Sequence, residues 1–218
     1  MAMPSSPPNQ PYTAASGLFG PPRADRAVVT ANILKRPTGE YTNHDIRNVI
    51  LPAYWECATH TGLDPVLVLA QSIHETGNFC SWWAARPRRN PAGIGVNGRT
   101  AERQPPGPYA TGEGWEFNTE TKQWQMGLRY ATWQDDAIPI HIGRLLAYLL
   151  PAEAGTPAQR ELIERALAQR PLPAALRGSV HVLRQLGRAH NPTGIGWASP
   201  GTYYGERIAA VANGLTAG

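Results

Sequence analysis

The sequence predicts an α+β fold that is mostly helical, with one small β-hairpin region. Several apolar segments at helical spacing begin at capping residues, and one short segment alternates around the polar turn "NTETK". The 22 glycines and 21 prolines add many loops and turns. With 218 residues, of which 42% are hydrophobic, the chain is long enough for one compact core. We expect a flexible Pro/Ser-rich tail over 1–26 and a single domain over 27–218.

The first two helices of the domain are marked by caps and prolines. A helix is expected from Asn43, with Asn43 as its N-cap, and Pro52 should kink or restart it. The next helix has Asp64 as N-cap, Pro65 at its first position and Gly77 as its stop. Its middle is apolar on nearly every side, which predicts a buried central helix.

The remaining elements follow in order along the chain. A loop-rich stretch is expected over 81–114, and "GWEFNTETKQWQMGLRYATW" then predicts a β-hairpin. Asp135 or Asp136 should cap the helix after the hairpin, and Thr156 should cap the one after that. The four helices expected in this half cover 135–150, 156–170, 173–187 and 202–215.

Charge and hydropathy restrict the classes of partner. The net charge is +4 and the pI is about 9.3, which suits an anionic partner or serves solubility alone. The arginines are dispersed apart from "RPRR" (86–89), so the sequence argues against nucleic acid as the main ligand. No apolar run approaches the roughly 20 residues that a membrane-spanning helix needs.

The cysteines and the N-terminus bear on the compartment. Cys57 and Cys80 lie in apolar surroundings, and we expect two buried free thiols, with a single disulfide as the alternative. The first residues lack a basic segment followed by an apolar core, so no Sec-type signal peptide is predicted.

The stretch "SIHETGNFCSWWAARPRRNPAGIGVNG" invites two interpretations that its context rejects. A zinc motif that begins with His74 needs a second histidine one helical turn later, but position 78 is Asn, so no metal is expected. The glycines of "GIGVNG" (93–98) match a phosphate-binding fingerprint. They follow a loop and lead into a proline-rich segment, whereas that fingerprint must join a strand to a helix.

Glu75 remains as a candidate acid in the same stretch. It lies on the last turn of the apolar helix, where partial desolvation and the negative end of the helix dipole both raise the pKa of a carboxyl group. A carboxyl that stays protonated near neutral pH can donate a proton to a leaving-group oxygen. The alternative is an ordinary solvated glutamate at a helix end.

Several blocks of the chain resemble one family of glycan-cleaving enzymes. "LDPVLVLAQSIHETGNFCS" followed by "NPAGIGV" looks like the catalytic signature of the glycoside hydrolase family 73 glucosaminidases, which are peptidoglycan hydrolases. "LRYATWQDDAIPIHIGRLLAY" and "GWASPGTYYGERIAAVAN" are similar to later blocks of that family. The resemblance covers roughly Tyr54 to Gly214, and it departs from the family pattern at Trp133 and Ile140, where the family has Ser and Asp.

The resemblance implies a lysozyme-like fold with a helical lobe and a small β-hairpin lobe. It implies that Glu75 is the general acid and that Tyr204 helps to stabilise the reacting sugar. A second glutamate on the hairpin would be Glu116, with Glu113 as the alternative. If neither reaches the sugar, the 2-acetamido group of the substrate can act as the nucleophile.

The substrate groove needs flat and polar side chains near the acid. Tryptophan faces suit sugar rings, although core packing is the alternative for each of them, and His141 is expected to be structural rather than catalytic. The candidates for substrate binding are His74, Trp83, Asn90, Trp133 and Tyr203.

The resulting expectation is a peptidoglycan hydrolase that cleaves the glycan strand at N-acetylglucosaminyl bonds. The alternatives are an N-acetylmuramidase, a lytic transglycosylase, and a non-catalytic wall-binding or phage structural module. The expected partner is the bacterial glycan strand, with no nucleic acid and no cofactor, and a monomer is favoured. Without a Sec signal, the protein would reach the wall through a holin, on a virion or by another route of export.

Overall fold

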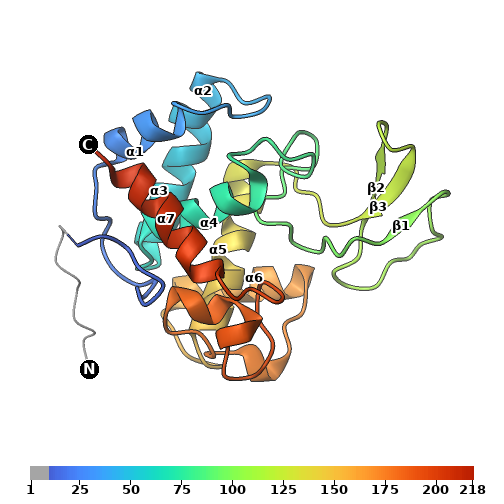
Figure 1. Cartoon of the computed structure of the whole chain (residues 1–218). Helices are drawn as coiled ribbons and strands as arrows, with labels where there is room; N and C mark the ends of the chain where they lie inside the picture. Colours follow the sequence, from blue (N-terminus) through green and yellow to red (C-terminus); the bar gives the residue numbers. More distant parts are fainter. Residues whose placement is uncertain (1–9) are drawn as a thin grey trace.

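The computed structural model describes residues 10–218 as a helical body from which a small sheet lobe projects to one side (Figure 1). The first nine residues of the predicted tail lie outside the described part. The secondary structure agrees with the predicted α+β class, with most elements helical and a single three-stranded sheet. No helix within residues 10–218 has the length and apolarity to cross a membrane.

The N-terminal segment is part of the body, so the prediction of a flexible tail is wrong for residues 10–26. Tyr12 and Leu18 are buried, and the Tyr12 hydroxyl donates a 2.7 Å hydrogen bond to the Asp64 carboxylate. Phe19 forms a β-bridge with Leu63. These apolar and aromatic side chains anchor a proline-rich segment whose composition alone predicts a flexible tail. Helix α1 (Arg26–Ile33) follows directly.

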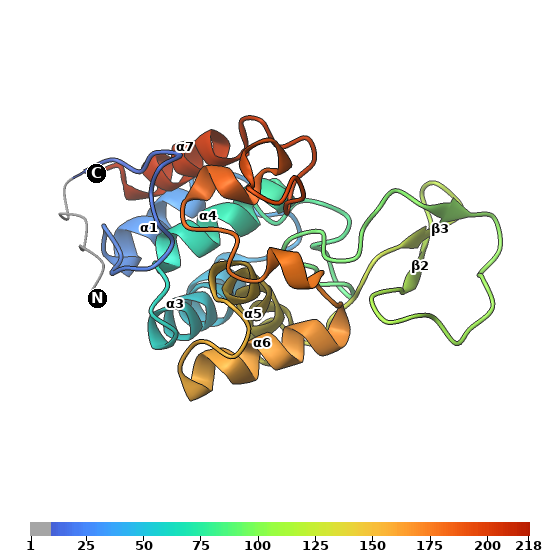
Figure 2. The ribbon, with the colours of Figure 1, turned by 90° about the horizontal axis from the view of Figure 1, so that it is seen from below.

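Helix α4 (Pro65–Thr76) is the buried centre of the body, as predicted. The Asp64 side chain accepts a hydrogen bond from the Val66 amide at its start, and Gly77 ends it in the left-handed region with a φ of 58°. Nearly every side chain of α4 is buried, and the helix lies between α3 and α7 (Figure 2). This rigid helix carries the candidate acid on its last turn.

The helix expected from Asn43 begins there, but its N-cap is Thr42 rather than Asn43. Thr42 is the N-cap, because its side chain accepts from the Asp45 amide while the Asp45 carboxylate accepts from the Thr42 amide. Pro52 then stands in the first turn of a restarted helix. The segment folds as three consecutive pieces: α2 (Asn43–Asp45), a π-helical turn (Ile46–Ile50) and α3 (Leu51–His60).

The predicted hairpin is confirmed and gains a third strand. Antiparallel strands β2 (Trp115–Asn118) and β3 (Gln123–Met126) flank a turn in which the Asn118 side chain accepts hydrogen bonds from two backbone amides. Strand β1 (Thr100–Ala101), inside the stretch expected to be loop, pairs with the other edge of β3. The strand order is therefore β1-β3-β2.

The two helices expected over 135–150 and 156–170 are present, but the N-cap predicted for the first of them is wrong. Thr132, rather than Asp135 or Asp136, caps a π-helical turn (Trp133–Ala137), and both carboxylates accept hydrogen bonds from Thr132. This turn leads into the fully buried α5 (Ile138–Leu149). Helix α6 (Pro157–Gln169) has the predicted Thr156 cap and packs along α5.

The helix expected over 173–187 is absent from the structure. The segment holds only the short 3-10 turns Ala174–Leu176 and Leu183–Leu186. Gly178 interrupts it with a φ of 68°, and a Cβ there would lie 2.8 Å from the backbone nitrogen of Pro151. A further 3-10 turn (Arg188–His190) precedes α7 (Tyr204–Thr216), the predicted C-terminal helix.

The two cysteines are free thiols, as expected, but only one of them is sheltered. Cys57 is half-buried on α3, whereas Cys80 is exposed. The expectation that both thiols are buried is therefore wrong for Cys80.

Candidate active site

Three segments that are distant in sequence meet at the carboxyl group of Glu75. The Oε1 atom of Glu75 accepts a 3.2 Å hydrogen bond from the indole nitrogen of Trp197 and a second hydrogen bond from the Tyr204 hydroxyl. Glu75 lies on the last turn of α4, Trp197 in the loop before α7, and Tyr204 on the first turn of α7. The packing of α4 against α7 thus holds the carboxyl between two donors.

Burial and hydrogen bonding act in opposite directions on the pKa of Glu75. Removal of the carboxyl from water raises its pKa above the ordinary value, while the hydrogen bonds from Tyr204 and Trp197 favour the charged form and oppose that rise. Both donors share Oε1, so the proton of the neutral acid belongs on Oε2. The sequence-based reasoning identified the direction of this shift, and the structure shows that burial is its main cause.

A buried chain of hydrogen bonds runs behind Tyr204. The side-chain nitrogen of Gln71 donates to the Tyr204 hydroxyl over 2.9 Å, and the side-chain oxygen of Gln71 lies 3.0 Å from Nε2 of His141. On its other side, Nδ1 of His141 lies 3.0 Å from the Tyr54 hydroxyl. Complete burial lowers the pKa of His141 to about 3, so the imidazole is neutral.

The neutral imidazole can satisfy both contacts in one tautomer. With the proton on Nε2, His141 donates to Gln71 and accepts from the Tyr54 hydroxyl. Gln71 must then offer its amide nitrogen to Tyr204, and the Tyr204 proton is left to point at Glu75. The role expected for His141, structural rather than catalytic, agrees with this position.

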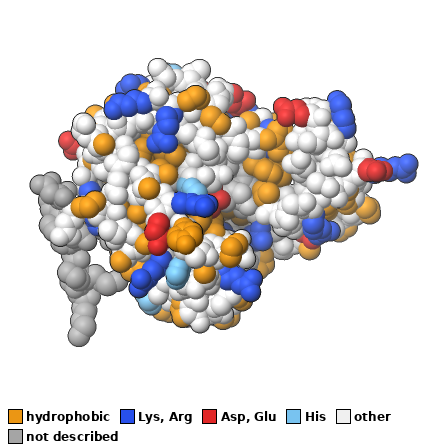
Figure 3. All heavy atoms as spheres, in the orientation of Figure 1, with side chains coloured by type: hydrophobic (Ala, Val, Ile, Leu, Met, Phe, Trp, Pro, Cys, Tyr) orange, Lys and Arg blue, Asp and Glu red, His pale blue; other side chains and the backbone are white. Residues whose placement is uncertain are grey.

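A cleft of about 820 Å³ opens in front of Glu75. It is lined by the loop after α4, including Trp83, and by the loop before α7, including Tyr203, whose side chain is 66% exposed. His74 lines it as well and meets the Tyr204 ring edge to face. Among the residues that line this cleft, Glu75 is the only carboxylate. Hydrophobic side chains also gather on the surface where the body meets the sheet lobe (Figure 3).

Two loops of similar sequence contribute residues to the wall of the cleft. "NPAGIGV" (90–96) and "NPTGIGW" (191–197) each contain a buried asparagine whose side chain bonds to its own loop. Asn90 is fully buried and also donates to the carbonyl oxygen of Leu128 over 2.8 Å. The prediction that Asn90 contacts substrate is therefore wrong, because its side chain holds the loop from inside.

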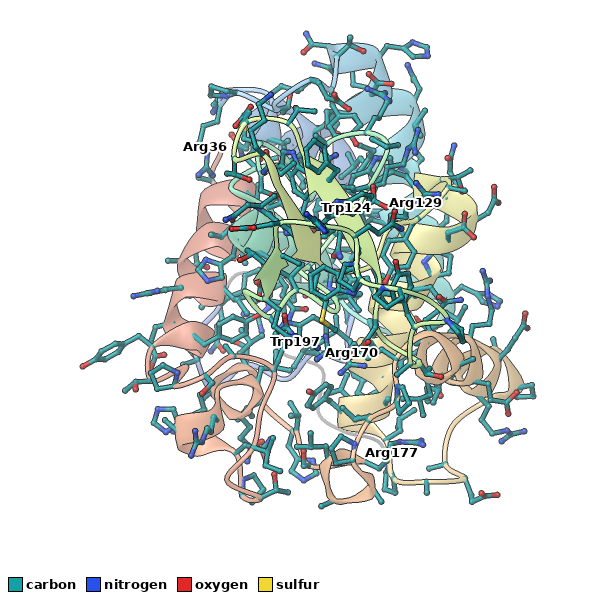
Figure 4. The ribbon with its side chains drawn as sticks, turned by 90° about the vertical axis from the view of Figure 1, so that its right-hand side faces the viewer. Arg36, Trp124, Arg129, Arg170, Arg177 and Trp197 are labelled. Atoms are coloured by element: carbon teal, nitrogen blue, oxygen red, sulfur yellow. The ribbon has the colours of Figure 1, made fainter. Side chains whose placement is uncertain are left out.

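Two further predicted residues do not reach the cleft. Trp133 is 3% exposed and packs edge to face against Tyr41 and Phe79, so its predicted place in a substrate groove is wrong. Glu116 lies on β2 in the sheet lobe, where its carboxylate is 3.4 Å from Nε of Arg129. Arg129 and Trp124 mark this lobe in Figure 4.

Glu113, the alternative to Glu116, forms an ion pair away from the cleft. Its carboxylate pairs with Arg99 at 3.2 Å. Neither hairpin glutamate lines the cleft at Glu75, and the structure does not bring either one to the acid.

Sequence reasoning missed two residues of the site. Gln71 precedes Glu75 by one helical turn, so the spacing alone places both on one face of α4. Trp197 stands in the block "GWASPG", which carried part of the family resemblance without a role for its indole. Only the three-dimensional packing shows that the indole nitrogen reaches Glu75.

Among residues 10–218, no group of three or more His, Cys, Asp or Glu side chains is arranged to hold a metal ion. Comparisons of the chain with protein-family models, with curated proteins and with solved structures returned no match.

Proposed function

We propose that the chain is a lysozyme-like peptidoglycan hydrolase that cleaves glycan strands at N-acetylglucosaminyl bonds, with Glu75 as the general acid. One observation carries the proposal. Glu75 is the single carboxyl group on the wall of a large cleft, and burial raises its pKa while two donors occupy one of its oxygens. A raised pKa extends the pH range over which the carboxyl keeps its proton and can donate it to a glycosidic oxygen.

The proposed first step is proton transfer from Oε2 of Glu75 to the glycosidic oxygen as the bond to the anomeric carbon breaks. The carboxylate that forms is stabilised by the hydrogen bonds from Tyr204 and Trp197, because hydrogen bonds to a charged acceptor are stronger than those to a neutral one. In the second step, the carboxylate takes a proton from the attacking water and the acid is restored.

The nucleophile of the proposed reaction is the substrate's own 2-acetamido oxygen. Glycosidases with two carboxylates hold them roughly 5 to 9.5 Å apart across the scissile bond, whereas no second carboxylate from residues 10–218 lines the cleft at Glu75. The acetamido oxygen would attack the anomeric carbon, and water would then open the cyclic intermediate with net retention of configuration.

Lytic transglycosylation is the second candidate activity, because it also needs only one carboxyl group. A lytic transglycosylase replaces the attacking water with the 6-hydroxyl of muramic acid, which forms an anhydro sugar and needs no second carboxylate. In both candidates, the exposed Tyr203 ring and the half-buried Trp83 ring offer flat faces for sugars.

The test is the clearing of purified cell walls by Glu75→Gln and Glu116→Gln variants. Glutamine keeps the two hydrogen bonds at position 75 and removes only the proton, so we expect a loss of about 10²- to 10⁴-fold. Glu116→Gln should keep most of the activity. Equal clearing by wild type and Glu75→Gln would exclude the assigned acid, and an equal loss in Glu116→Gln would restore the two-carboxylate mechanism. Binding of walls without clearing by any form would favour a non-catalytic module.

A further inference from the structure

A second cavity lies beside the cleft, on the other side of Trp197. Its volume is about 290 Å³, and it shares Ala92, Gly93, Val96 and Trp197 with the cleft. The two spaces therefore adjoin at these four residues. The charged side chains that line the smaller cavity are those of two arginines, Arg144 and Arg170, and no carboxylate lines it.

Arg144 is a buried cation without a negative partner. It is 9% exposed, and its Nη1 atom donates to the carbonyl oxygen of Arg170 over 3.0 Å. Its guanidinium lies 5.9 Å from the ring centre of Trp197 and 6.0 Å from that of Tyr148. None of the ion pairs among the described residues includes Arg144. Burial of an unpaired charge is costly, and Arg144 lines the cavity, so an anion bound there would offset that cost.

Arg170 adds a second positive charge to the same cavity. It caps the C-terminal end of α6, and its side-chain stem packs against Gly112, where a Cβ would lie 3.0 Å from the Arg170 Cγ. Its charge lies close enough to Arg144 to lower the pKa of that guanidinium, in addition to the larger effect of burial. Figure 4 shows Arg170 next to Trp197, with Arg177 farther away. Two positive side chains on one cavity wall, with no carboxylate among its lining residues, favour the binding of an anion.

A buried hydroxyl outside the lining of the cavity also lacks a hydrogen-bond partner in the described structure. The Tyr130 hydroxyl is buried without a hydrogen-bond partner in the described structure, and the charges of Arg144 and Arg170 both act on it. An uncharged buried hydroxyl without a partner costs free energy unless a ligand or water supplies an acceptor.

We propose that the cavity of Arg144 and Arg170 is a subsite for a carboxylate carried by the substrate. Guanidinium groups bind planar carboxylates through paired hydrogen bonds, and the cavity adjoins the cleft in which the sugar would lie. The choice of a substrate carboxylate rests on the proposed function. In peptidoglycan, carboxylates occur on the stem peptide and, where the stem is missing, on the lactyl group of muramic acid.

The test is an NMR titration of the folded protein with three probes. They are N-acetylmuramic acid, which has the lactyl carboxylate, N-acetylglucosamine, which lacks it, and the stem tripeptide L-Ala-γ-D-Glu-diaminopimelate. The variant is Arg170→Gln, because Arg170 is half-buried and its change spares the core. The matched control is Arg160→Gln, an exposed arginine ten residues earlier on α6 and roughly 15 Å away by helical rise.

We expect one of the two carboxylate probes to bind wild type and Arg160→Gln at least about tenfold more tightly than N-acetylglucosamine. Arg170→Gln should lose this margin. A preference for N-acetylmuramic acid identifies the lactyl group, and a preference for the tripeptide identifies the stem. The proposal is overturned if wild type binds no carboxylate probe more tightly than N-acetylglucosamine, or if Arg170→Gln keeps the full margin.

The titration involves no cleavage, so its result is separate from that of the wall-clearing assay. An Arg170-dependent preference in a protein that releases no fragments would support the subsite and contradict the hydrolase. Wall clearing without that preference would support the hydrolase and contradict the subsite.

Discussion

Substitution of Tyr204 by Phe isolates the hydrogen bond that links α7 to the candidate acid. The Tyr204 hydroxyl donates to Glu75 and accepts from the amide nitrogen of Gln71, so its removal leaves the buried Gln71 amide without an acceptor, while Glu75 keeps the hydrogen bond from Trp197. A buried polar group left unsatisfied costs about 1–3 kcal/mol. For a chain of this length, each kcal/mol lowers the melting temperature by about 2–4 °C. The expected loss is therefore about 2–12 °C.

The same substitution should move the pH dependence of activity in a defined direction. The hydrogen bond from Tyr204 favours the charged form of Glu75, so without it the pKa of Glu75 rises further. A general acid works only while it is protonated. The alkaline limb of the pH–activity profile should therefore move to higher pH in Tyr204→Phe, even if the maximal rate falls.

Tyr203→Phe is the matched control, because it removes the neighbouring hydroxyl from a side chain that is 66% exposed. Melting curves and pH–activity profiles of both variants are compared with wild type. The reasoning is refuted if Tyr204→Phe melts like wild type, or if its alkaline limb stays in place or moves to lower pH. A shift of the same size in Tyr203→Phe would show that the effect does not come from the bond to Glu75.

Four further substitutions test other parts of the fold and the site. Burial raises the pKa of Asp64 to about 6, above its usual 3.8, so its charge should cost the fold up to about 3 kcal/mol as pH rises from 4 to 6. Asp64→Asn should remove that part of the pH dependence of the unfolding free energy, measured by urea unfolding at several pH values. An unchanged pH dependence would contradict the prediction. Gly143→Ala places a Cβ 2.0 Å from the Leu162 carbonyl oxygen and should destabilise by about 1–3 kcal/mol or more. Gly214→Ala, which has open space on α7, should stabilise by about 0.5–1 kcal/mol, and thermal melts that rank the two alike would refute this contrast. Gln71→Met should lower kcat more than it raises KM, and steady-state kinetics with an unchanged kcat would remove Gln71 from the positioning of Tyr204.

Local chemistry made the centre of this fold predictable. Asp64, Pro65 and Gly77 delimit α4 because each satisfies a backbone requirement at a helix end that neighbouring residues decide. Glu75 could be singled out for the same reason, since its place on the last turn of an apolar helix depends on nothing distant. The polar turn between β2 and β3 is likewise a local signal.

The predictions that were wrong or missing concern residues whose positions depend on contacts distant in the sequence. Trp133 lies in a plausible groove position by sequence, yet the edges of Tyr41 and Phe79 enclose it. Gly178 breaks an expected helix because it must pass close to Pro151, which is far away in the sequence. The indole of Trp197 reaches Glu75 across 122 positions of chain, and no local pattern encodes that contact.

The most direct test of the proposed function is mass spectrometry of the fragments released from peptidoglycan after reduction with borohydride. Wild type should release strands that end in reduced N-acetylglucosamine, and Glu75→Gln should release almost none. Fragments that end in reduced muramic acid or in anhydromuramic acid would contradict the assigned bond. Release of the same fragments by wild type and by Glu75→Gln would contradict the assignment of Glu75 as the acid.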